Sequence, residues 1–244
     1  MRYSAGLSLH GRGIAFEKGG GVNVLVLSAH PDDETLGCGG TLLKHRAAGD
    51  DVFWAIATVC HEPQWPSALI QRKAEEVDRV GDAYGVARLW RLGFPNARLD
   101  TVATADLMEK LNCVVKEARP QTVYVLHGGD IHTDHHALFT AAMSVLKPFY
   151  MARLGVRRVL CYETLSSSDA APPQRERAFV PNMFSDITPH IDRKIEIMRM
   201  YESEIHEDPM PRGPSAIRAL ARFRGAIISV PYAEAFTLVR ELMA

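Results

Sequence analysis

The stretch VNVLVLSAHPDDE, residues 22–34, joins an apolar segment directly to a cluster of polar residues. Residues 22–28 form a nearly continuous apolar run, which is typical of a strand buried on both faces of a sheet. Four ionisable side chains follow within five positions: His30, Asp32, Asp33 and Glu34. Ligands of α/β proteins bind beyond the carboxyl ends of the strands, so this junction is a candidate functional site.

The chain on either side alternates between strand and helix patterns. Strands are predicted over residues 22–28, 52–58, 88–92, 122–126 and 158–162, and helices over 41–48, 66–84, 105–118 and 134–146. This alternation predicts an α/β fold of the Rossmann-like, doubly wound kind, with a mostly parallel sheet between two helical layers. After residue 163, loops rich in Pro and Ser separate helices over 191–205 and from 215, which indicates a C-terminal helical elaboration of the same domain.

Composition limits the function classes. The chain has 244 residues, 47% of them hydrophobic, which suits one domain of residues 22–244 preceded by an extension of residues 1–21. The 28 basic and 29 acidic residues nearly cancel, so no basic field favours nucleic acid. Four dispersed cysteines, no signal-peptide pattern and no apolar run of membrane-spanning length predict a cytoplasmic protein that acts on a small polar molecule.

A second polar cluster, HGGDIHTDHH (residues 127–136), follows the predicted strand 122–126. If this strand lies beside strand 22–28, then His30, Asp33 and either His132 or His135 can converge on one metal ion. Two histidines and one carboxylate suit zinc with an open position for water, although the same ligand types also bind iron and manganese. An Asp-Asp pair after a strand is more often a helix-start signal, but two such clusters at strand ends favour a metal site.

A metal-assisted hydrolase also needs a base and an acid. Asp32 is adjacent to the predicted ligand Asp33 and points elsewhere from the turn, so it is the candidate base. One of the two histidines would bind the metal, and the other, paired with Asp134, would act as an acid or an electrostatic stabiliser. Asp130 and His127 lie on the same loop and are candidates for supporting the ligands from behind.

These motifs resemble those of the PIG-L and LmbE-like family of zinc-dependent N-deacetylases. The resemblance rests on AHPDDE with the following TLGCGGT (residues 29–41) and on the H-x-D-H motif of residues 132–135. Further similar segments are RKAE (72–75), YGV (84–86), LGFP (92–95), RG (224–225) and AEAF (233–236), so the resemblance spans roughly residues 22–240. It implies the Rossmann-like fold and one metal ion per chain, with zinc expected and other divalent metals compatible.

The resemblance also implies roles for single residues. His30, Asp33 and His135 would bind the metal. Asp32 would be the general base, and His132, oriented by Asp134, would stabilise the tetrahedral intermediate or protonate the leaving amine. The implied reaction removes the N-acetyl group from an amino sugar or sugar conjugate, in bacterial glycoconjugate or surface-polysaccharide biosynthesis, and members of the family are often homo-oligomers.

Two further residues are weaker candidates for substrate contact. Arg72 matches a family arginine near the mouth of the site. Trp65 follows the second predicted strand and could stack on a sugar face, or it could simply cover the core as a loop aromatic. Two alternative functions stay open: an amidase acting on an N-formyl or thiol-conjugate substrate, and a non-catalytic sugar-binding module on the same fold.

Overall fold

The structure is a computed structural model that describes residues 21–243, so the expected N-terminal extension lies outside the described residues except for Gly21. The strands are β1 (Asn23–Ser28), β2 (Asp51–Val59), β3 (Arg88–Pro95), β4 (Thr122–Leu126), β5 (Arg158–Tyr162), β6 (Met183–Asp186) and β7 (Ala233–Glu241). The α-helices are α1 (Asp33–Ala48), α2 (Ser67–Tyr84), α3 (Thr104–Ala118), α4 (Thr133–Val145), α5 (Pro148–Leu154), α6 (Ile191–Met198) and α7 (Pro214–Ile227). Short 3-10 helices cover Leu99–Thr101 and Arg175–Arg177.

All seven strands form one sheet in the order β3-β2-β1-β4-β5-β7-β6. Strands β1 to β5 are parallel, whereas β7 runs antiparallel to both β5 and β6. Strand β1 lies between β2 and β4, which confirms that the two polar clusters follow neighbouring strands. The strand order reverses at β1, and this is the position where doubly wound sheets form a ligand-binding crevice.

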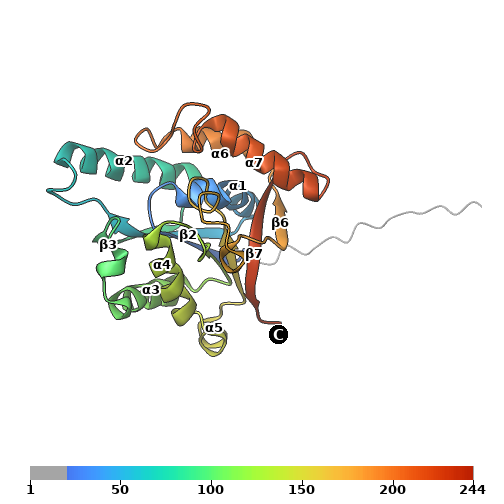
Figure 1. The fold of residues 1–244 in the computed structure, drawn as a ribbon. Helices are drawn as coiled ribbons and strands as arrows, with labels where there is room; N and C mark the ends of the chain where they lie inside the picture. The colour runs from blue at the N-terminus through green and yellow to red at the C-terminus, as the bar shows by residue number, and fades with distance from the viewer. Residues whose placement is uncertain (1–20, 244) are drawn as a thin grey trace, which may run out of the picture.

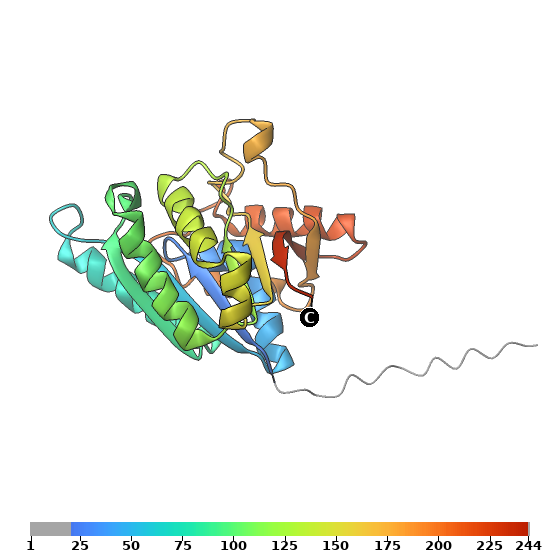
Figure 2. The same cartoon turned by 90° about the horizontal axis from the view of Figure 1, so that it is seen from below.

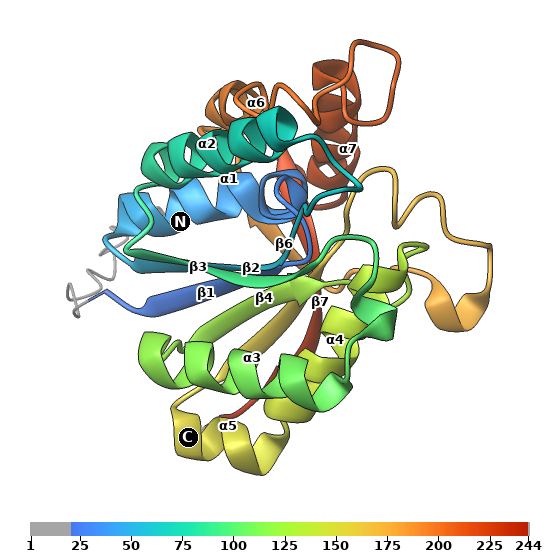
Figure 3. The same cartoon turned by 90° about the vertical axis from the view of Figure 1, so that its left-hand side faces the viewer.

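Helices cover both faces of the sheet. Figure 3 shows α1, α2, α6 and α7 on one side and α3, α4 and α5 on the other. The C-terminal elements α6, α7, β6 and β7 gather at one end of the sheet (Figures 1 and 2). The expected doubly wound α/β fold is therefore confirmed. Within the described residues, no helix combines the length and apolar character that crossing a bilayer requires.

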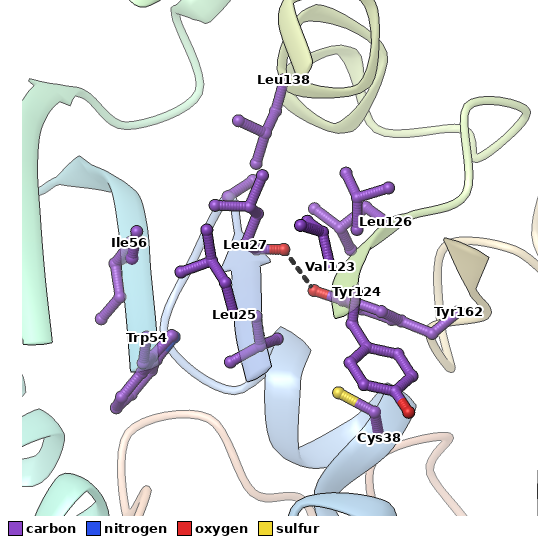
Figure 4. Packing of buried hydrophobic residues seen from close by; sticks show 14 of the residues in the cluster. Leu25, Leu27, Cys38, Trp54, Ile56, Val123, Tyr124, Leu126, Leu138 and Tyr162 are labelled. Atoms are coloured by element: carbon purple, nitrogen blue, oxygen red, sulfur yellow. Dashed lines mark hydrogen bonds between the residues drawn. The ribbon is translucent and has the colours of Figure 1, made fainter. Parts of the chain in front are cut away.

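The core brings helix α1 close to the sheet (Figure 4). The buried Tyr162 of β5 donates a hydrogen bond of 2.8 Å from its hydroxyl to the carbonyl oxygen of Leu27. A Cβ on Gly37 would lie 2.0 Å from the Tyr162 ring, so only glycine permits this approach. The packing fixes α1, which carries the AHPDDE carboxylates at its start, against the end of β1.

Several elements differ from the sequence prediction. Helix α1 begins at Asp33 instead of residue 41, because its glycines pack inside the helix and do not form a turn. Helix α5, which was not predicted, begins at Pro148, whose missing N–H has no cost in the first turn of a helix. The helix predicted over 191–205 ends at Met198, and β6 and β7, which were not predicted, extend the sheet by antiparallel pairing.

Candidate metal centre and active site

Three predicted ligands meet at the ends of β1 and β4. Asp33 stands in the first turn of α1, and its two oxygens face two imidazole rings. Asp33 Oδ2 lies 3.6 Å from His30 Nδ1, and Asp33 Oδ1 lies 3.4 Å from Nε2 of His135, which is in the first turn of α4. Asp33 and His135 are almost fully buried, and His30 is partly exposed toward the pocket.

The Asp-Asp pair does not cap the helix with its side chains. Asp32 occupies the N-cap position of α1 but makes no side-chain capping hydrogen bond. Asp33 Oδ2 instead accepts hydrogen bonds from the backbone N–H groups of Ala29 and His30, at 3.0 and 2.7 Å. These bonds fix the turn that follows β1 and hold the Asp33 carboxylate toward the two histidines.

A carboxylate supports each of these histidines from behind. His30 Nε2 lies 2.9 Å from Asp134 Oδ2, and His135 Nδ1 lies 2.8 Å from Asp130 Oδ2. Each ring therefore donates one N–H to a carboxylate and turns its other nitrogen toward Asp33. Metal-bound histidines in proteins are oriented by this kind of contact.

The geometry fits a small divalent cation. In a tetrahedral site with zinc bonds of about 2.0–2.1 Å, neighbouring ligand atoms are about 3.4 Å apart. Each imidazole nitrogen lies close to this distance from one oxygen of Asp33, Oδ2 for His30 and Oδ1 for His135. His132 is also near, since nitrogens of His30, His132 and His135 lie within 4.8 Å of one another. A three-histidine set is thus a geometric alternative to the predicted ligands.

The protonation states agree with a cation at this position. Burial alone would raise the pKa of Asp33, but the neighbouring His135 and His30 outweigh it and lower the pKa to about 2. Burial alone would lower the pKa of His135, but Asp33 and Asp130 raise it to about 10. These groups therefore stabilise one positive charge between the carboxylates, which is the charge distribution that suits a bound metal.

The Asp134 carboxylate does not contact His132, contrary to the sequence prediction. It does not orient His132: besides His30, it accepts hydrogen bonds from the backbone N–H groups of Ala97 and Leu99, at 2.8 and 2.9 Å. The backbone N–H of Asp134, not its side chain, donates to His132 Nδ1 at 3.2 Å. The reason is the helix start, because His132 is the N-cap residue of α4 and accepts from the first turn.

His132 lies beside the two other histidines. Its ring centroid is 4.4 Å from that of His30 and 5.0 Å from that of His135. Burial and the two neighbouring imidazoles lower its pKa to about 4. Because Nδ1 accepts the backbone hydrogen bond, the proton of the neutral ring resides on Nε2.

Asp32 is the most unusual residue of the site. Its backbone φ of 100° is in the left-handed region, which non-glycine residues rarely adopt and which often marks functional positions. Arg212 Nη1 lies 2.9 Å from Asp32 Oδ2 and 2.8 Å from Glu204 Oε2. Burial, Asp33 and Glu204 raise the pKa of Asp32 well above its usual value, and Arg212 partly opposes this rise.

A pocket of about 370 Å³ opens beside the histidines. Lys73 lines it, whereas Arg72 is exposed on the outer side of α2 and does not. The buried residues Glu76, Val77 and Val80 define the inner face of α2, and helical spacing puts Lys73 on that face. Arg72 therefore does not line the pocket, whereas its neighbour Lys73 does and forms an ion pair with Glu204.

Two other candidates lie away from the ligands. Trp65 is half-buried and is not among the residues that line this pocket. His127 Nε2 lies 2.9 Å from the carbonyl oxygen of Arg177, and its ring packs against Phe179. Of the two supporting residues suggested by the sequence, only Asp130 touches a predicted ligand.

The structure adds residues that the sequence did not indicate. Arg212 comes from the C-terminal part of the chain, reaches Asp32 across 180 positions and also contacts Glu204, so no local motif identifies the pair. Ser168 donates a hydrogen bond of 2.5 Å to Asp130 Oδ1, which links the loop after β5 to the carboxylate behind His135. Ser168 belongs to a Ser-rich segment whose composition indicated only a loop.

Substituting Asp130 with asparagine is expected to weaken metal binding by about 10–100-fold, because His135 loses a charged acceptor that orients its ring. Isothermal titration of the metal-free protein with zinc measures the change. Asp50→Asn is the matched control, since Asp50 Oδ2 makes the same kind of contact, 2.7 Å, with His45 Nδ1 outside the site. Equal zinc affinities of the two variants would contradict the supporting role of Asp130.

The fold and site thus define a class: α/β proteins with a cluster of histidines and carboxylates, a candidate metal centre, at the switch point of the sheet. The sequence pattern of the family described as PIG-L: GlcNAc-PI de-N-acetylase matches residues 25–146, half of the chain. The chain belongs to the PIG-L family.

Relatives match across most of the chain. The diacetylchitobiose deacetylase of Thermococcus kodakarensis is 26% identical and covers 88% of this chain and 82% of its own length. The 1D-myo-inositol 2-acetamido-2-deoxy-alpha-D-glucopyranoside deacetylase of Saccharomonospora viridis is 27% identical, with coverages of 89% and 95%.

Solved structures share the fold. A conserved protein of Thermus thermophilus superposes with a TM-score of 0.73 at 25% identity, covering 91% of this chain and 97% of that one. A 4-carboxy-2-hydroxymuconate hydratase of Pseudomonas putida superposes with a TM-score of 0.65 at 18% identity, with coverages of 91% and 97%. This fold therefore carries more than one chemistry, and the reaction has to be argued from the site.

Proposed function

We propose that the protein is a metal-dependent N-deacetylase that hydrolyses the N-acetyl amide of an amino sugar or sugar conjugate. The observation that carries the proposal is the arrangement of His30, Asp33 and His135 around one point, with Asp32 and His132 beside it. The names of the relatives support the substrate class, since they act on N-acetylated sugars. We take residues 22–244 as the catalytic domain.

Zinc is the proposed metal, with His30, Asp33 and His135 as its ligands and one ion per chain. The choice rests on the nitrogen and oxygen donor set and on the closeness of the Asp33 carboxylate to both imidazoles. When bound, the metal lowers the pKa of a coordinated water toward about 7 and polarises the amide carbonyl. The cytoplasmic location and a homo-oligomeric state stay predictions from the sequence.

The side chains around the metal then perform the proton transfers. Asp32 accepts a proton from the attacking water, whose oxygen bonds to the carbonyl carbon. The neutral His132 has its proton on Nε2 and donates a hydrogen bond to the oxygen that becomes negative. The carbon-nitrogen bond breaks, Asp32 returns the proton to the amine, and acetate and the free amino sugar leave.

Arg212 holds the Asp32 carboxylate in this scheme. Replacing Arg212 with alanine is expected to lower kcat by about 10²-fold with little change in KM, because a misoriented base loses proton-transfer geometry. Arg212→Lys, which can keep one contact to Asp32, is expected to recover part of the loss. Steady-state kinetics of the two variants measures the effect, with Arg218→Ala as control since Arg218 pairs with the exposed Asp192. A rise in KM alone would contradict the positioning role.

Acetate release by the zinc-loaded protein tests the function. The panel contains free, nucleotide-linked and lipid-linked N-acetylglucosamine, an N-formyl amino sugar and a thiol-conjugate amide. We expect acetate from at least one N-acetyl sugar, and no release after removal of the metal with a chelator. Release only from the formyl or thiol-conjugate substrate would favour the alternative amidase. Tight sugar binding without turnover would favour the non-catalytic module.

A further inference from the structure

We propose that the pocket accepts an acyl group longer than acetyl, so that the preferred substrate is an amino sugar with a longer N-acyl chain. The acyl chain would lie along one wall of the pocket. We call this the apolar wall; it is formed by Leu36, Ile56, Val59, Ile70, Ala74 and Val77. This inference rests on the proposed function, because it assumes that the scissile amide sits at the metal centre.

The apolar wall reaches into the core of the protein. Leu36, Ile56 and Val77 are only 3%, 1% and 3% exposed, yet all three line the pocket. Ile70, Ala74 and Val77 are four and three positions apart, so they form one stripe along α2 that runs from the exposed Ala74 to the buried Val77. The apolar wall therefore connects the opening of the pocket at Ala74 with core side chains of α1, α2 and β2.

The apolar wall begins at the metal centre. Leu36 is one helical turn after Asp33, and its backbone N–H donates to the carbonyl oxygen of Asp32 at 2.8 Å. On β2, Thr58 also lines the pocket and donates from its hydroxyl to the carbonyl oxygen of Ala29, next to His30, at 2.7 Å. A group on this wall is thus close to the scissile carbonyl.

The sugar ring and the acyl chain need different surroundings. Sugar hydroxyls require hydrogen-bond partners, and burying them against Leu, Ile and Val side chains would leave them unsatisfied. The same pocket also offers polar partners, among them Asn96, Ser166, Ser167 and Glu204. Because the acyl group is bonded directly to the scissile carbonyl, it is the apolar part of the substrate that can reach the wall beside Asp33.

A series of N-acyl glucosamines with acetyl, propionyl, butyryl and hexanoyl groups tests the inference on the zinc-loaded protein. Each methylene buried on the wall is expected to raise kcat/KM by up to about fourfold, which corresponds to about 0.8 kcal/mol. Hydrolysis of the acetyl substrate with a flat or falling series would overturn the inference and leave the proposed function intact. Release of no acyl group from any substrate would instead overturn the proposed function.

Two variants of α2 test where the acyl chain of the substrate binds. Ala74→Phe places a ring in the stripe and is expected to lower the ratio of hexanoyl to acetyl kcat/KM at least tenfold. Ala68→Phe is the control, since Ala68 is exposed on the same helix and does not line the pocket. An equal ratio in both variants would overturn the placement on this wall.

A second substrate series separates the acyl chain from an apolar aglycone. Methyl, butyl and octyl glycosides of N-acetylglucosamine carry the apolar part at the other end of the sugar. We expect their kcat/KM to change less than twofold along the series. A gain with glycoside length that Ala74→Phe removes would mean that the wall binds the aglycone, and the acyl proposal would be wrong.

Discussion

Replacing Asp32 with asparagine is expected to reduce kcat by about 10²–10⁴-fold while the protein keeps its metal. Asparagine preserves the shape of the side chain and can still accept a hydrogen bond from Arg212, but it cannot take a proton from water. The predicted ligands His30, Asp33 and His135 are unchanged, so their contacts stay in place. Deacetylation rates together with metal content by atomic emission measure both parts of the result.

The control for this variant is Asp82→Asn, which changes an exposed carboxylate on α2 away from the pocket lining. It removes the same charge, so a shared loss of activity would point to net charge instead of base catalysis. Turnover at the wild-type rate in Asp32→Asn, with metal bound, would eliminate Asp32 as the base.

Substituting Asp33 with alanine is expected to release the metal and abolish deacetylation, whereas His132→Ala is expected to keep the metal and lose about 10²–10³-fold in kcat. Asp33 faces both His30 and His135 at distances that suit a shared ion, but His132 Nδ1 is engaged by a backbone N–H. Zinc titration and kinetics of the two purified variants give the comparison.

This pair of variants distinguishes the two possible ligand sets. If the three histidines bound the metal, His132→Ala would lose zinc and Asp33→Ala would retain it. His127→Ala is a suitable control, because His127 belongs to the same loop but contacts the carbonyl oxygen of Arg177. Its zinc affinity should equal that of the wild type.

The sequence predicted the parallel part of the fold because each buried strand leaves a local signal. Residues 122–126 and 158–162 were predicted with the bounds of β4 and β5. Strands β6 and β7 left no such signal. β6 is a short, half-buried edge strand, and β7 forms by antiparallel pairing between β5 and β6, so both depend on distant segments of the chain. Local propensity in strands is weak compared with the effect of neighbours.

The candidate site, like the fold, could be predicted from local sequence only in part. The residues near the ends of β1 and β4 could be predicted to converge, because the carboxyl ends of parallel strands meet at one edge. Side-chain direction could not be predicted. The carboxylate of Asp134 lies on His30 because His132 is the N-cap residue of α4, and one position along α2 decides that Lys73, not Arg72, lines the pocket. Such details depend on packing between segments far apart in the chain.

The contact between Arg212 and Asp32 joins the part of the chain that the family pattern covers to a part that it does not. All residues proposed to bind the metal lie before residue 146, inside the covered segment, while Arg212 and Glu204 lie beyond it. Substitutions at Arg212 or Glu204 can therefore change the turnover rate through Asp32 without altering the predicted metal ligands. Tuning of the rate on this scaffold could begin at residues 204–212 and leave the histidines untouched.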